Sequence, residues 1–391
     1  MPNASLTPHI SPLISQIKIG YDAKRAFFNN TGLGNYSRWL IKAMTSHYAG
    51  NTYYLYTPQA KANSRLNFLK DNGNIHIVTP RSNLFTSLWR SKGIVADLKR
   101  DGIQLFHGLS HELPLGIKQS GVKSVVTVHD LIFMRFPRQF GRINHWIYTT
   151  KIKYACRVAD KIIAVSQKTK DDIIELLGIP PEKIEVVYQG CNPAFGIAQT
   201  NEQKLAVKQK YNLPNKFILS VGTIEERKNL LLTVKALLSV NNDTPLVVVG
   251  KPTSYTKKVK AFIAAHNLGD SVFFLHDVDF HDLPAIYQQA TVFVYVSRYE
   301  GFGIPLLEAI NCGTPVIAAT GSCLEEAGGP NSLYVGPDDA TGLAENINKV
   351  LKNDTLRQLM AEKGRHHAAK FAEDKLSLQL MQLYTNTLSH A

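Results

Sequence analysis

The sequence predicts an α/β protein made of two halves, each a doubly wound parallel sheet. At 391 residues the chain is long enough for two domains that each bury a core of their own. Short β-branched runs alternate with helical patterns along the whole length, which is typical of βαβ units. Between residues 190 and 214 no period is strong, and small or rigid residues typical of a linker occur there.

Short apolar runs mark the expected strands of both halves. In the first half they are residues 17–21, 52–56, 75–78, 103–107, 124–129, 161–165 and 184–188. In the second half they are residues 217–221, 246–250, 272–275, 292–296, 315–319 and 333–335. A helical pattern returns from residue 354 to the end. We therefore expect one domain over 1–195, a second over 196–370 and a terminal helix over 371–391.

Composition excludes several protein classes. The chain is 44% apolar and 19% charged, with 26 Gly and 18 Pro spread along it, which excludes a disordered tail or a fibrous repeat. No apolar run is long enough to span a bilayer and the first residues do not resemble a secretion signal, so we expect a cytoplasmic protein. The cysteines lack metal-site spacing, so we expect reduced, structural thiols at Cys156, Cys191, Cys312 and Cys323.

The net charge of +13 lies entirely in the first half. Residues 1–200 carry 25 Lys+Arg against 12 Asp+Glu, whereas residues 201–391 carry 19 of each. A basic half favours an anionic partner such as a phosphorylated substrate or an acidic lipid surface. We do not expect nucleic acid as a partner, because the basic residues are dispersed and no nucleic-acid motif accompanies them. A solvated basic face without a partner is also consistent with this pattern.

The first predicted strand runs into the segment Thr31-Gly32-Leu33-Gly34-Asn35-Tyr36, which predicts a glycine turn before a helix that begins near Ser37. Gly32 and Gly34 would let the backbone approach a ligand, and the helix start would offer N–H groups to a phosphate. A plain tight turn explains the same residues. Because Ser37 stands where a dinucleotide fingerprint has its third glycine, a nicotinamide-dependent oxidoreductase is disfavoured.

Two further strand ends carry candidate polar residues. Strand 124–129 ends in His129-Asp130, where a histidine can bind sugar hydroxyls or move protons, although a buried structural histidine is an alternative. Strand 217–221 is followed by Gly222 and then by the adjacent cations Arg227 and Lys228. Cations are unfavourable at a helix start, so this placement favours binding of a diphosphate.

The segment from Tyr299 to Ala309 is the most informative stretch. Its glycines free backbone N–H groups, and a helix beginning near Pro305 directs its positive end at the loop. Glu300 and Glu308 bracket this anion-binding turn, as expected where acids hold hydroxyls of a sugar and a ribose. The D-x-D triplet at 277–279 is interpreted as a solvated loop, because Arg227 and Lys228 already supply the positive charge that a metal would bring.

Together these segments resemble glycosyltransferase family 4, the retaining, metal-independent enzymes of GT-B fold. The similar segments are GLGNY, VVTVHD, ADKIIAVSQKTKDDI, KIEVVYQGCNPAF, SVGTIEERKNL and EGFGIPLLEAINCGTPVIA. The resemblance implies two Rossmann-like domains that face each other across a cleft, with a C-terminal helix that crosses back to the N-terminal domain. It implies that the N-terminal domain binds the acceptor and the C-terminal domain the nucleotide-sugar.

The resemblance also implies roles for single residues. Glu300 would bind donor sugar hydroxyls, Glu308 the ribose, and Arg227 with Lys228 the diphosphate, while His129 would lie beside the transferred sugar. The other donor-binding positions would be Gly32, Gly34, Gly222, Val278, Gly301, Phe302, Gly303 and Ile304. Thr223 departs from members that have an arginine directly after this glycine, which leaves a second cationic contact there in question.

The expected activity is that of a retaining hexosyltransferase that needs no cofactor and no metal. The forms VTVHDLIFMRFP and GTIEERKN most resemble mannosyltransferases of bacterial surface polysaccharide, which favours GDP-mannose as donor and leaves UDP-sugars open. The acceptor would be a glycan or a lipid-diphosphate-linked glycan, reached by peripheral contact with an anionic inner membrane. The alternatives are a nucleotide-sugar 2-epimerase of GT-B fold and a non-catalytic nucleotide-sugar-binding protein.

Overall fold

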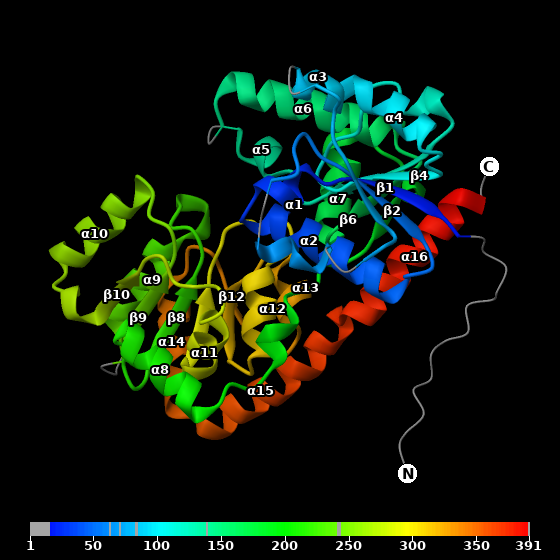
Figure 1. Ribbon diagram of the computed structural model, residues 1–391. Coiled ribbons are helices and arrows are strands. Elements are labelled where there is room, and N and C mark those ends of the chain that lie inside the picture. Colours follow the sequence, from blue (N-terminus) through cyan, green and yellow to red (C-terminus); the bar gives the residue numbers. More distant parts are fainter. Residues whose placement is uncertain are drawn as a thin grey trace, which may run out of the picture. The chain divides into compact units, whose positions relative to one another are not determined.

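A computed structural model describes residues 16–61, 64–69, 72–82, 85–137, 140–240 and 244–389. It contains two parallel β-sheets with helices, as the sequence predicts (Figure 1). By internal contacts the chain forms two compact units, which are described one at a time. Unit 1 comprises residues 1–127, 150–162 and 379–391, and unit 2 comprises residues 128–149 and 163–378. The predicted domain boundaries at 195 and 370 stay a prediction.

The first sheet has seven strands in the order β3-β2-β1-β4-β5-β6-β7. Strand β1 is central, with Tyr21 in register with Leu55 on one side and His107 on the other. The strands are β1 (Lys18–Asp22), β2 (Thr52–Tyr56), β3 (Ile75–Val78), β4 (Leu105–Gly108), β5 (Lys123–Val128), β6 (Lys161–Ala164) and β7 (Ile184–Val186).

The second sheet has six strands in the order β10-β9-β8-β11-β12-β13. The strands are β8 (Ile218–Val221), β9 (Leu246–Val249), β10 (Val272–Leu275), β11 (Val292–Tyr295), β12 (Val316–Ala319) and β13 (Leu333–Val335). Every predicted strand is present, with its ends within two residues of the prediction. In each sheet the order reverses once, between β1 and β4 and between β8 and β11. Ligands of open α/β sheets bind at such reversal points, beyond the carboxyl ends of the strands.

The helices connect and cover these strands. They are α1 (Lys24–Phe28), α2 (Gly32–His47), α3 (Thr86–Leu88), α4 (Ile94–Arg100), α5 (Ile132–Arg135), α6 (Arg142–Val158), α7 (Gln167–Leu177), α8 (Asn201–Tyr211), α9 (Leu230–Ala236), α10 (Tyr255–Ala265), α11 (Leu283–Gln289), α12 (Ile304–Asn311), α13 (Leu324–Gly328), α14 (Ala340–Lys352), α15 (Asp354–Ala368) and α16 (Glu373–Ser389). Among the described residues, no helix combines the length and the apolar character needed to cross a bilayer.

Each unit has a core of large apolar and aromatic side chains. In unit 1, Tyr21 and Tyr53 are fully buried and stack with ring centroids 6.1 Å apart. The end of α16 completes this core, because the Tyr384 hydroxyl lies 2.6 Å from His107 Nδ1. In unit 2, Phe195 and Tyr287 are fully buried and meet edge to face. The four cysteines are free thiols.

The predicted glycine turn before Ser37 is wrong, because α2 begins at Gly32. Gly34 lies inside the first turn of that helix. A Cβ at Gly34 would come within 1.8 Å of the Asn29 carbonyl oxygen, so glycine allows α2 to approach the end of α1 closely. Arg38 then donates to the Ala26 and Asn29 carbonyls at 2.8 Å and satisfies acceptors at the end of α1.

Candidate functional site

A cluster of polar groups in unit 2 lies at the reversal point between β8 and β11. The loop after β8 carries Gly222, Arg227 and Lys228, and the loop after β11 carries Glu300. Because both strands are parallel neighbours, their carboxyl ends meet at one edge of the sheet. The sequence motifs thus converge at the place where the sheet topology predicts a ligand.

Glu300 is held by three donors on one oxygen. Its Oε1 accepts hydrogen bonds from the Tyr295 hydroxyl at 2.7 Å and from the Ser297 hydroxyl at 2.9 Å, and it pairs with Arg227 Nη1 at 2.7 Å. Burial raises the pKa of Glu300, but the charges of Lys228 and Arg227 and these hydrogen bonds outweigh it, so the net pKa lies below its usual value. Glu300 is therefore a fixed, ionised acceptor.

Arg227 is a buried cation whose charge is already shared. Its guanidinium pairs with Glu225 at 2.5 Å as well as with Glu300, and it donates to the Tyr299 carbonyl. Burial lowers the pKa of Arg227, but the two carboxylates outweigh it and raise the net pKa. Its side chain is 13% exposed, so we interpret Arg227 as the group that fixes the two loops and Glu300 in place.

Lys228, unlike Arg227, is not held in an ion pair with a neighbouring carboxylate among the described residues. Its ammonium lies 5.5 Å from the centre of the Tyr295 ring, and within the described part of the chain it forms no ion pair under 4.0 Å. A Cβ at Gly222 would lie 2.9 Å from Lys228 Nζ, so the lysine ammonium lies against the glycine that directly follows β8. Lys228 lowers the pKa of both Glu300 and Glu308. It is thus the positive charge that both carboxylates face.

The loop between Glu300 and α12 depends on two glycines. A Cβ at Gly301 would meet the His129 carbonyl oxygen at 1.8 Å, and the Gly301 carbonyl accepts from the Ser166 hydroxyl at 2.6 Å. Gly303 has φ +107°, which side-chain-bearing residues rarely adopt, and directly precedes α12. The chain can therefore pass close to His129 and then turn into a helix whose N-terminus faces the loop.

Glu308 lies on α12, half-buried, and accepts from the Tyr287 hydroxyl at 3.1 Å. Burial raises its pKa to about 7, against the opposing effects of the Tyr287 hydrogen bond and of Lys228. Glu300 and Glu308 therefore differ in protonation near neutral pH, with Glu300 ionised and Glu308 titrating.

His129 and Asp130 follow β5 and belong to the same unit as Glu300. His129 is 5% exposed, and its Nδ1 lies 2.8 Å from Gln189 Nε2, which fixes the ring orientation. Burial raises the pKa of Asp130. The hydrogen bond that its carboxylate accepts from the Ile132 N–H and the charges of His129 and Arg227 lower this pKa, but burial outweighs them. Asp130 thus shares the electrostatic environment of the site.

The comparisons with known proteins give the family. The sequence profile described as "Glycosyltransferase Family 4" matches residues 31–195, and the profile described as "Glycosyl transferases group 1" matches residues 201–367. The chain belongs to the family 4, group 1 glycosyltransferases.

Similar proteins agree with this assignment. The glycosyltransferase is 28% identical over 285 residues to the O-antigen chain mannosyltransferase B of Escherichia coli, covering 72% of this chain and 74% of that protein. It is 31% identical over 229 residues to the O-antigen chain mannosyltransferase RfbU of Salmonella typhimurium, covering 59% of this chain and 60% of that protein.

Solved structures show the same fold. A glycosyltransferase from Rickettsia africae superposes with a TM-score of 0.76 at 19% identity, over 97% of this chain and all of that one. HepE of Anabaena, solved with UDP and glucose, superposes with a TM-score of 0.73 at 19% identity, over 95% of this chain and all of that one. The glycosyltransferase therefore has the predicted GT-B fold, with two Rossmann-like sheets.

The other predicted donor-binding residues of the glycosyltransferase lie outside the cluster of Lys228, Arg227 and Glu300. Phe302 is 3% exposed, with its ring packed in a cluster with those of Tyr188 and Phe371, so its backbone alone is left for a donor. Val278 lies half-buried in the loop after β10, and Ile304 is the first residue of α12. Gly32 and Gly34 lie in unit 1. Their contacts with the donor stay predictions.

Sequence reasoning missed the residues that support the predicted ones. Tyr295, Ser297 and Gln189 fix Glu300 and His129 through hydrogen bonds that no local motif indicates. Asp130, which the sequence already pairs with His129 at the end of the strand, adds a carboxyl group to the same environment. Among the residues that the structure describes, no group of three or more His, Cys, Asp or Glu could hold a metal ion.

Proposed function

We propose that this glycosyltransferase transfers mannose from GDP-mannose, with retention, to a hydroxyl of a glycan or lipid-diphosphate-linked glycan in surface polysaccharide synthesis. The observation that carries the donor site is the juxtaposition of Lys228, Arg227 and Glu300 at the reversal point of the second sheet. The choice of mannose is supported by the two relatives, which are O-antigen chain mannosyltransferases.

Each group of the site has a role that fits its surroundings. Oε1 of Glu300 is occupied by three donors, so the other oxygen of this carboxylate would accept from sugar hydroxyls. Lys228 would bind the diphosphate, since its charge is not committed to a carboxylate within hydrogen-bond distance. N–H groups at the start of α12 would add donors, and Glu308 would bind ribose hydroxyls.

The proposed chemistry uses the leaving group itself. Lys228 and the helix N-terminus would stabilise the charge that develops on the departing diphosphate while the sugar becomes oxocarbenium-like. The acceptor hydroxyl would attack from the same face, its proton passing to the departing phosphate oxygen. The C–O bond to the diphosphate breaks as the new glycosidic C–O bond forms, so no side-chain base is required. His129 would orient the sugar. No metal is proposed, because Lys228 provides the positive charge.

A transfer assay tests this proposal. The purified protein is incubated with GDP-mannose or UDP-glucose, with and without a manno-oligosaccharide acceptor, and the products are analysed by NMR. We expect a new α-mannoside and GDP, formed only with acceptor and from an α-linked donor. Formation of a 2-epimer without acceptor would indicate an epimerase, and donor binding without turnover would indicate a non-catalytic binding protein. Either outcome would contradict the proposal.

We also propose peripheral contact with an anionic membrane, supported by helix α6. This helix carries four Lys or Arg residues and no Asp or Glu, and its exposed face includes Ile143 and Trp146, which are 75% and 68% exposed. Basic residues beside exposed aromatic and aliphatic side chains are typical of helices that lie in a membrane interface.

Vesicle co-sedimentation tests the membrane contact. We expect the protein to sediment with vesicles that contain anionic lipid and not with neutral ones, and Trp146→Ala to reduce this binding severalfold. Leu238→Ala, which removes another exposed apolar side chain, is the matched control and should have no effect. Equal sedimentation of the wild type and Trp146→Ala would contradict the role of α6.

A further inference from the structure

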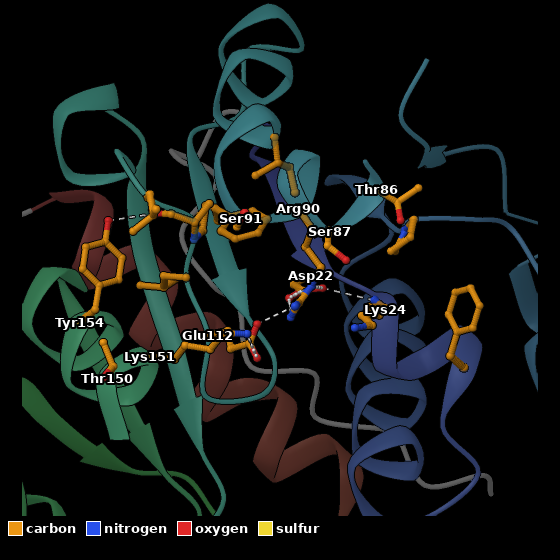
Figure 2. A pocket seen from close by; sticks show the side chains of 17 residues that line it. Asp22, Lys24, Thr86, Ser87, Arg90, Ser91, Glu112, Thr150, Lys151 and Tyr154 are labelled. Carbon is orange, nitrogen blue, oxygen red and sulfur yellow. Dashed lines mark hydrogen bonds and ion pairs between the residues drawn. The ribbon is translucent and has the colours of Figure 1, made fainter. Parts of the chain in front are cut away.

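The pocket of unit 1 and the site of unit 2 hold largely buried polar side chains of different kinds. The pocket has a volume of about 440 Å³ and lies at the carboxyl end of β1. In it, Arg90 pairs with Asp22 and with Glu112 at 2.5 Å each (Figure 2). These side chains are held by charge. In unit 2, by contrast, His129 meets the neutral side chain of Gln189, so the direction of one hydrogen bond bears on the state of the ring.

His129 is held on both its backbone and its ring. It follows β5, whereas Gln189 follows β7, and β6 lies between these strands in the sheet. Both residues are buried, with exposures of 5% and 8%. The His129 carbonyl accepts a hydrogen bond from Thr169 Oγ1 at 3.4 Å, and a Cβ at Gly301 would come within 1.8 Å of the same oxygen. The backbone therefore has little room to move, and the ring stays in contact with Gln189.

The contact with Gln189 has a direction. A neutral imidazole has one nitrogen that carries a proton and one that accepts a hydrogen bond. Gln189 Nε2 lies 2.8 Å from His129 Nδ1, and an amide nitrogen can only donate. Nδ1 must therefore be the acceptor, which places the ring proton on Nε2. A doubly protonated ring would set two donors against each other at this contact, so Gln189 also opposes the charged form of His129.

We infer that Gln189 is a positioning residue that sets the tautomer of His129, with the proton on Nε2 and the lone pair of Nδ1 directed at the amide. The Nε2 nitrogen of such a ring is a hydrogen-bond donor and has no lone pair with which to take a proton. His129 would then donate to an oxygen of the transferred sugar and would not act as a base through Nε2. This agrees with the proposed passage of the acceptor proton to the departing phosphate oxygen. The consequence for transfer rests on the proposed function, whereas the tautomer does not.

Nitrogen NMR tests the tautomer without catalysis. The full-length protein is prepared with histidine labelled at both ring nitrogens, and the His129 signals are identified by their absence from His129→Asn. At neutral pH we expect the chemical shift of an unprotonated nitrogen at Nδ1 and of a protonated nitrogen at Nε2. A proton on Nδ1, or on both nitrogens, would overturn the inference.

Two variants separate the effect of Gln189 from the preference of the ring itself. Gln189→Glu keeps the shape of the side chain but presents only acceptor oxygens, so the proton should move to Nδ1. Gln189→Met keeps most of the volume and removes the hydrogen bond, so the signals should average between the two tautomers. Gln209→Glu, at an exposed position on α8, is the matched control and should leave the His129 signals unchanged. Unchanged His129 signals in either Gln189 variant would overturn the inference.

Transfer kinetics test whether Gln189 acts through His129. With the wrong tautomer the ring no longer donates to the sugar, so we expect Gln189→Glu to lower kcat by at least about tenfold, with a smaller change in the donor KM. In a His129→Ala background the same substitution should have no further effect, because residues that act as one unit are not additive. Equal losses of kcat in the two backgrounds would overturn the positioning role.

The two kinds of experiment separate this inference from the proposed function. If no transfer is found but the His129 signals respond to Gln189→Glu as expected, the proposed function fails and the tautomer assignment stands. If transfer is found and the His129 signals do not respond to Gln189→Glu, the tautomer assignment fails alone.

Discussion

Arg227 Nη1 lies 2.7 Å from Glu300 Oε1, and this ion pair joins the loop after β8 to the loop after β11. Arg227 and Ser297 on these two loops are 70 residues apart in sequence, yet the loops meet because β8 and β11 are neighbours in the sheet. The pair fixes the carboxylate and leaves Lys228 as the cation available to a ligand. Arg227 thus has a structural role, whereas Lys228 is the residue expected to bind the ligand.

Loss of the Glu300 charge should reduce transfer strongly. Glu300→Gln keeps the shape and a hydrogen-bond acceptor but removes the ionised group proposed to bind donor hydroxyls, so we expect kcat/KM to fall by on the order of 100-fold. The matched control is Glu345→Gln, at an exposed position on α14, which should have wild-type activity. Full activity of Glu300→Gln in the transfer assay would contradict the assigned role.

Truncation of Lys228 should weaken binding of the diphosphate and spare the nucleoside. A hydrogen bond to a charged group contributes about 1.5–3 kcal/mol, so Lys228→Ala should reduce GDP affinity roughly 10- to 100-fold. Guanosine affinity should stay nearly unchanged. Lys258→Ala, which removes an exposed cation paired with Glu226, serves as control. Affinities are measured by calorimetry. An equal loss of affinity for GDP and for guanosine would argue against a contact between Lys228 and the diphosphate.

Glu308 should make stability depend on pH in a defined direction. Its folded-state pKa of about 7 lies above the ordinary value of 4.5, so the unfolded chain loses this proton first. Stability should therefore fall as pH rises from about 4.5 to 7, by up to about 3 kcal/mol from this group. Glu308→Gln lacks this term, so its melting temperature relative to wild type should be higher at pH 8 than at pH 5. The same difference at both pH values would show that Glu308 is not buried in this way.

Gly301 should tolerate no side chain. A Cβ there would meet the His129 carbonyl oxygen at 1.8 Å, so Gly301→Ala must push the two backbone segments apart, at a cost of at least about 1–3 kcal/mol. Gly269→Ala is the matched control, since a Cβ at Gly269 meets nothing within 4 Å. Thermal unfolding should show a clearly lower melting temperature for Gly301→Ala and almost no change for Gly269→Ala. Equal melting temperatures would contradict the close approach.

The fold could be predicted almost completely from the sequence, because buried parallel strands are short β-branched runs bounded by glycine and polar turns. The start of α2 could not. Glycines at 32 and 34 fit a turn as well as a helix, and the deciding fact is the contact of Gly34 with the Asn29 carbonyl. Such a contact depends on tertiary packing, which local pattern does not reveal.

The site could be predicted only where its residues belong to one local motif, and not where tertiary packing brings distant residues together. The spacing of Glu300 and Glu308 lies within one loop and helix and is visible in the sequence. The pocket of unit 1 was not predicted, because Asp22 and Arg90 are 68 residues apart and Arg90 and Glu112 are 22 apart. No local motif joins them, and only the folded sheet brings these charges together.

The most direct test of the central claim is a thermal-shift measurement with GDP, GDP-mannose, UDP and ADP, first with a chelator and then with magnesium. A ligand that binds the folded state alone stabilises it by about 2.7 kcal/mol at a hundredfold excess over Kd. We predict that GDP and GDP-mannose raise the melting temperature equally with and without magnesium, and that Lys228→Ala reduces this rise. No rise with any nucleotide, or a rise that requires magnesium, would contradict a donor site built on Lys228, Arg227 and Glu300.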